Sequence, residues 1–281
     1  MILQYGILLA LLTAILWAIA DFLSKILMDK NESEYYVLAF ISLTGAVAIF
    51  IISLIFGKLE NILNIYLLVL IGLGILEVLA YEMFLKTIKH GKLSLAMPIA
   101  YSSSAVTLIL SLIFYRELLN FPQALAILGI IIGIFIVAHK QGKIKSHLPI
   151  FTAITSMILY GIYYFLLKIP LQVFNPYTVS WMAALTTGLL SLFYASIKHK
   201  NFLTRKDIGI SSVVGLFVSG GFLLFLFAIN IAPVGIVATV KSIAPVIGII
   251  LAGIVLKEKL SKKELVGIVL AIVGIIILSL F

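Results

Sequence analysis

The chain has 281 residues, and 63% of them are hydrophobic. Soluble domains are about 45–50% apolar, and the mean hydropathy is +1.25, so the composition predicts a membrane protein. The formal charge of +9 comes from 20 basic and 11 acidic residues that lie mostly in short connections. There we expect membrane lipid headgroups, and no nucleic acid, as partners. The absence of cysteine excludes disulfides, thiol catalysis and thiolate metal sites.

Ten apolar segments with short polar connections use up the sequence. A bilayer core about 30 Å thick needs about 20 apolar residues per helix, so we expect an all-α integral membrane protein with ten transmembrane helices. The expected helices are 5–27, 35–56, 65–86, 93–114, 121–139, 149–168, 177–197, 208–229, 234–256 and 264–281. The expected localisation is the cell membrane, as a multi-pass protein.

The two halves of the chain are similar to each other. A shift of 141 residues places Glu117 on Glu258, each at a corner between two helices, and also aligns a glycine in the helix that follows. We expect the two glutamates to cap or brace the tight turns at these corners. Such internal similarity indicates a duplication. We therefore predict a first five-helix repeat at 1–140 and a second at 141–281.

An odd number of helices per repeat makes the second repeat enter the membrane from the opposite side. The sequence thus predicts inverted-topology repeats, a common construction of secondary transporters, whose substrate site lies near mid-membrane between the halves. In such a pair, each repeat can take the conformation of the other, which produces alternating access.

The basic residues indicate an orientation. Sixteen Lys and Arg residues lie in connections on one side of the predicted membrane, and three lie on the other. The positive-inside rule places the basic side in the cytoplasm and both termini outside.

Three short motifs occupy positions set by the predicted repeats. They are Trp17-Ala18-x-x-x-Phe22-x-x-Lys25, its second copy Tyr160-Gly161…Lys168, and Ala244-Pro245-Val246 followed by Leu256-Lys257-Glu258. With the helix count and the duplication, they make the chain resemble the ten-helix drug/metabolite transporter superfamily, specifically the EamA-type permeases. Ala18 and Lys257 stand where this family usually has glycine.

This resemblance implies export or exchange of small metabolites, amino acids or drugs without ATP hydrolysis. It also implies that both termini are cytoplasmic, against the count of basic residues. The orientation therefore stays open.

Three ionisable residues are predicted inside the membrane, where a charge costs about 2.5–3.5 kcal/mol and normally faces a cavity or a partner. Glu77, near mid-plane, could bind a proton or a cationic substrate, or could be a structural partner in the bundle. Lys241 could attract an anionic group, pair with Glu77, or snorkel to the interface. Asp21 could be a gate or coupling residue and could pair with Lys25 one turn away.

Polar and aromatic residues near interruptions of the fourth and ninth helices are predicted to line the site. Pro98 and Pro245 are expected to kink these helices and free backbone carbonyls, and interruptions at matching places indicate a binding site. The candidate cavity-lining residues are Trp17, Tyr101, Ser102, Ser103, Ser104, Tyr160, Tyr163, Tyr164, Trp181 and Ser242. Membrane-interface belts and lipid-facing packing are the alternative interpretation of any one of them.

The sequence carries no catalytic, cofactor or metal-binding motif. The four histidines fall in connections, and no Gly-rich phosphate loop is present. The leading hypothesis is a secondary-active carrier of small organic solutes, coupled to protons or a counter-substrate. A lipid-headgroup flippase and an intramembrane lipid-modifying enzyme are the alternatives. A monomer and a homodimer both remain open.

Overall fold

The structure is a computed structural model that describes residues 2–30, 33–62, 65–90, 99–138, 148–198, 202–248 and 262–280. Within these ranges it is all-helical, and the predicted ten-helix fold is confirmed. The first half contains α1 (Ile2–Asp29), α2 (Glu34–Ile55), α3 (Tyr66–His90), α5 (Ser103–Leu110), the π-helical turn η1 (Ser111–Tyr115) and α6 (Phe121–Ala138). The second half contains α7 (Leu148–Leu166), the 3₁₀ turn η2 (Pro170–Gln172), α8 (Pro176–Lys198), α9 (Arg205–Ile231), α10 (Val234–Lys241) and α12 (Lys262–Leu280).

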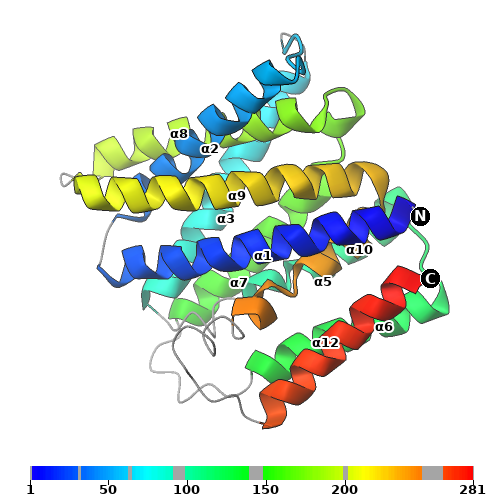
Figure 1. Cartoon of the computed structure of the whole chain (residues 1–281). Coiled ribbons are helices and arrows are strands. Elements are labelled where there is room, and N and C mark those ends of the chain that lie inside the picture. Colours follow the sequence, from blue (N-terminus) through cyan, green and yellow to red (C-terminus); the bar gives the residue numbers. More distant parts are fainter. Residues whose placement is uncertain are drawn as a thin grey trace.

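Helix length follows from the apolar runs, because a backbone inside a bilayer must satisfy its hydrogen bonds within the helix. Six of the described helices are long and apolar enough to cross a membrane, and shorter apolar helices accompany them. Both termini lie at one end of the bundle (Figure 1).

The fourth and ninth helices are interrupted. In the ninth, α10 ends at Lys241, and the chain turns through Ser242 and Ile243 before helix resumes. The interruption lies just before Pro245, which has no N–H to donate and whose ring clashes with the carbonyl four residues earlier. In the fourth, a turn at Ser102 separates Ile99–Tyr101 from α5. Pro98 lies outside the described residues.

The main helix pairings join the two halves of the chain. α1 packs along α9, α3 along α7, α2 against α8, α5 against α10 and α6 against α12 (Figure 1). In the second half, α7, α8, α9, α10 and α12 correspond to α1, α2, α3, α5 and α6 of the first half. If each helix is exchanged for its counterpart, the pair α1–α9 becomes α7–α3, and the other three pairs become themselves. This is the packing expected of two repeats related by a two-fold axis, although the predicted boundary at 140/141 lies outside the described residues.

Two glycines allow neighbouring helices of the bundle to approach each other closely. A Cβ atom on Gly161 of α7 would lie 2.4 Å from Cβ of Val106 in α5. A Cβ atom on Gly221 of α9 would lie 2.6 Å from the indole nitrogen of Trp17 in α1. Small residues at membrane helix interfaces allow such close approach.

Candidate functional site

A cavity lies where α1, α3, α5, α7, α9 and α10 converge. It is lined by Trp17, Asp21, Glu77, Tyr81, Phe84, Ala100, Tyr101, Ser103, Tyr160, Tyr163, Tyr164, Val218, Phe222 and Lys241. The three ionisable residues singled out in the sequence thus border one space, and most of the remaining lining is aromatic. Asp21 and Glu77 come from the first half of the chain, and Lys241 comes from the second.

Lys241 is the last residue of α10, and its side chain is only 1% exposed. Its Nζ lies 3.5 Å from the ring centroid of Tyr164, 5.0 Å from that of Trp17 and 5.5 Å from that of Tyr101. Aromatic faces attract a cation through their quadrupole, so these rings form an aromatic cage around the ammonium group. The lysine therefore points into the bundle rather than snorkelling to an interface.

The cage supplies Lys241 with no formal negative charge. Among the described residues, no carboxylate oxygen lies within ion-pair distance (4.0 Å) of Lys241 Nζ. The carboxylate that interacts electrostatically with it over a longer distance is Asp21. The pairing with Glu77 that the sequence left open is not the arrangement found here.

Asp21 is 6% exposed, and its Oδ2 accepts a hydrogen bond of 2.7 Å from the Tyr101 hydroxyl. Lys25, the partner expected one turn away, instead donates from Nζ to the backbone carbonyl of Ile88 at 2.7 Å. Asp21 is therefore held by a neutral donor and turned towards the cavity.

Glu77 is half-buried on α3 and is held by two hydroxyl groups from other helices. Its Oε2 accepts hydrogen bonds from Tyr163 of α7 at 3.0 Å and from Thr187 of α8 at 2.8 Å. Hydrogen bonds to an ionised group are stronger than neutral ones, but hydroxyl groups do not neutralise its charge. Glu77 can therefore accept a proton or the positive group of a ligand.

The aromatic lining is a connected set of rings. Tyr160 and Tyr164 stack with ring centroids 5.4 Å apart, and Trp17 stacks on Tyr164 at 5.9 Å. The Trp17 indole N–H donates to the backbone carbonyl of Val218 at 3.1 Å. These ring contacts give the cavity a largely aromatic wall around its charged groups, as ligand pockets commonly have.

Sequence reasoning missed several residues at this cavity. Tyr81, Phe84 and Phe222 line it, and Thr187 binds Glu77. The helical repeat was a usable signal for two of them, because Tyr81 and Phe84 follow Glu77 by about one and two turns on the same helix face. Nothing local marks Thr187, which reaches Glu77 from a different helix.

The structure places other candidates away from this lining. Trp181 packs edge-on against Phe50 with ring centroids 5.3 Å apart. The Ser242 hydroxyl donates to the backbone carbonyl of Thr239 at 2.6 Å. Ser102 lies in the turn that precedes α5, and Ser104 is buried within α5.

Comparison with known proteins identifies relatives of this chain. The sequence model of the EamA-like transporter family matches residues 4–138 and, a second time, residues 147–280. An uncharacterized protein of Methanocaldococcus jannaschii is 30% identical over 137 residues, which cover 47% of this chain and 96% of that protein. An uncharacterized transporter of Archaeoglobus fulgidus is 23% identical over 197 residues, which cover 70% of each chain.

Solved structures share the fold, among them one crystal structure of a protein. It superposes with a TM-score of 0.77 over 95% of this chain and 98% of the other, at 14% sequence identity. Likeness at this level of identity concerns the fold alone.

Proposed function

The chain belongs to the EamA-like transporter family, and on that premise we propose that it is a secondary-active carrier that exports or exchanges small organic solutes by alternating access. It is a multi-pass protein of the cell membrane with apolar helices that are long enough to span a bilayer. The family implies a transporter rather than an enzyme, and a small-molecule substrate.

The observation that supports the carrier best is the position of the cavity. It lies between helices from both halves of the chain, and each half contributes a charged group. A site at the interface of two repeats can be exposed to either side when the repeats rock against each other. The helix pairings, which are unchanged when the halves are exchanged, favour such a movement.

We propose that the two repeats are 1–140 and 141–281. Two separate matches to one family model support this division. The relative from Methanocaldococcus jannaschii is consistent with it, because 137 aligned residues nearly span that protein and about half of this chain. Contacts such as α1 with α9 and α3 with α7 are related by the same exchange.

The charged groups suit a ligand that carries charges of both signs. Lys241 lacks a close carboxylate among the described residues and can hold an anionic group. Glu77 and Asp21 are bound by hydroxyl donors and can hold a cationic group or a proton. A zwitterion such as an amino acid satisfies both requirements, and the aromatic rings provide surface for its side chain.

Coupling follows if a proton and a cationic group compete for Glu77. A ligand shifts a conformational equilibrium only by its difference in affinity for the two states. Protonation of a mid-membrane carboxylate that faces the cavity can provide such a difference, because it changes the charge that the closed cavity must bury.

The test is uptake of a mixed metabolite pool into proteoliposomes, read by mass spectrometry with and without an imposed pH gradient. We expect specific solutes to accumulate above the level in empty liposomes, and Glu77→Gln to abolish the effect of the gradient. Glu60→Gln is the matched control, because Glu60 is exposed and binds the Asn175 backbone N–H outside the cavity. No accumulation with folded protein would contradict the carrier, and an unchanged pH effect in Glu77→Gln would remove Glu77 from coupling.

A further inference from the structure

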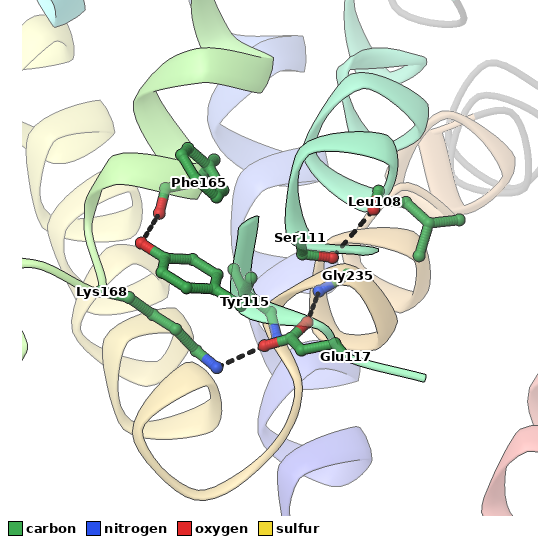
Figure 2. A network of polar contacts seen from close by, with 8 residues as sticks. Leu108, Ser111, Tyr115, Glu117, Phe165, Lys168 and Gly235 are labelled. Carbon is green, nitrogen blue, oxygen red and sulfur yellow. Dashed lines mark hydrogen bonds and ion pairs between the residues drawn. The ribbon is translucent and has the colours of Figure 1, made fainter. Parts of the chain in front are cut away.

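The eight-residue helix α10 meets a charged side chain at each of its two ends. Its last residue is Lys241, in the aromatic cage of the cavity. Its first turn is bound by Glu117, which belongs to the first half of the chain and lies in the connection between η1 and α6 (Figure 2). At 1.5 Å per residue, about 10 Å of helix separates the two ends.

Glu117 satisfies the backbone groups that a helix leaves unpaired at its start. Its Oε1 accepts from the Val234 N–H at 3.1 Å, and its Oε2 accepts from the Gly235 N–H at 3.2 Å. The N-cap residue of α10 is Pro233, which has no side-chain acceptor of its own. A carboxylate at this end also interacts favourably with the helix dipole.

Local structure around Glu117 fixes its position. Arg116 has φ of 52°, a left-handed conformation that reverses the chain directly after η1, and the Glu117 N–H donates to the Ser111 carbonyl at 3.3 Å. Lys168 forms an ion pair with Glu117. The Tyr115 hydroxyl donates to the Phe165 carbonyl at 3.0 Å, which ties the same turn to α7 (Figure 2).

The two ends of α10 are not held in the same way. Beyond Lys241 the α-helical hydrogen bonds give way to two tighter turn bonds, from the Ser242 N–H to the Thr239 carbonyl at 3.1 Å and from the Ile243 N–H to the Val240 carbonyl at 3.2 Å. At the start, Gly235 approaches α5 so closely that a Cβ atom would lie 2.7 Å from the Ser111 hydroxyl oxygen. Glu117 and this close contact therefore fix the start of α10 along its axis.

We propose that Glu117 is a positioning residue for Lys241. By holding the first turn of α10, it determines where the ammonium group lies among the aromatic rings of the cavity. This role differs from bracing the corner between the fourth and fifth helices, which the sequence suggested. It rests on the proposed function only in assigning Lys241 to the substrate site.

The chain contains a natural reporter for this proposal. It has two tryptophans, and Trp17 lies with its ring centroid 5.0 Å from Lys241 Nζ. With Trp181→Phe as background, the emission of the purified protein reports on Trp17 alone. A charge at this distance in a low-dielectric site interacts strongly with the indole ring, and Lys241→Met defines the spectral shift that follows its removal.

We expect Glu117→Ala to shift the Trp17 emission in the same direction as Lys241→Met. In the Lys241→Met background, Glu117→Ala should add no further shift, because its effect passes through the lysine. Gln123→Ala is the matched control and should leave the emission unchanged. Gln123 forms a capping box with Asn120 at the same corner, with hydrogen bonds of 2.8 and 3.0 Å, and within the described part of the chain no hydrogen bond joins it to α10.

Two results would overturn the proposal. One is an unchanged emission spectrum in folded Glu117→Ala, and the other is a shift of equal size with and without Lys241.

Glu117 and Lys168 also line a second cavity with Gln172 and Asn230, so water can reach Lys168 when its partner is removed. If Glu117→Ala still fails to fold, Glu117→Gln replaces it and should give a smaller shift in the same direction, with no shift again contradicting the proposal.

These spectra require no transported solute. A positive result therefore stands even if the carrier proposal fails in liposomes, and a negative result leaves that proposal untouched.

Discussion

Substitution of Gly221 tests the contact that holds Trp17 at the cavity. In Gly221→Ala the new methyl group would lie 2.6 Å from Nε1 and 2.7 Å from Cδ1 of Trp17, so the indole must move. The neighbouring Gly220→Ala is a control with the same chemistry, because its methyl group would lie 3.6 Å from Leu16 Cδ1, an ordinary van der Waals distance.

The expected difference in stability between the two variants follows from one stabilising and two destabilising contributions. Replacing glycine by alanine in a helix gains about 1 kcal/mol, and both variants receive this gain. Overpacking costs about 1–3 kcal/mol, and displacement of Trp17 also removes its hydrogen bond of 3.1 Å to Val218, worth about 1 kcal/mol. We therefore expect Gly221→Ala to be about 2–4 kcal/mol less stable than Gly220→Ala.

The assay is thermal unfolding of both variants in the same detergent, with Trp17 emission recorded alongside. Gly220→Ala should unfold at or above the wild-type temperature, and Gly221→Ala well below it. The reasoning is refuted if the two variants unfold at the same temperature, or if Gly221→Ala is the more stable. Restored stability in Gly221→Ala with Trp17→Phe, which provides a smaller ring, would identify the indole as the source of the clash.

Three further predictions concern two polar contacts and one backbone conformation. Thr187→Val removes a 2.8 Å hydrogen bond to Glu77 and should lower the free energy of unfolding by about 1.5–3 kcal/mol; an equally large effect in a Glu77→Gln background would contradict this. Lys30→Met breaks the ion pair with Asp207, in which the lysine is 39% exposed, so its cost should be about 1 kcal/mol at low salt and shrink in 1 M salt. Arg116→Gly removes the Cβ atom that makes the left-handed conformation costly and should raise the unfolding temperature slightly. Arg116→Val should lower it, because a β-branched side chain is tolerated less well than arginine in this conformation.

The turn at Ser242 and Ile243 shows how far local sequence can predict the site helices. Pro245 was identified as the cause of an interruption in the ninth helix, and the turn lies directly before it. What surrounds Lys241 could not be derived in this way, because Trp17, Tyr101 and Tyr164 come from three other helices.

The corner at Glu117 shows the same limit. Its position between two helices predicts that it caps or braces that turn, whereas in the structure its carboxylate caps the first turn of α10. The helix that it caps begins at Val234, 117 residues further along the chain. A single sequence records no contact over that separation.

The sequence by itself determined the ten helices and the membrane environment, because a segment in a bilayer must satisfy its own backbone hydrogen bonds, and apolar length decides where it can do so. The tertiary structure alone decided the partners of the buried charges. Tyr163 and Thr187 hold Glu77, and Tyr101 holds Asp21. These contacts depend on which helix faces meet, and that depends on close packing between segments that lie far apart in the chain.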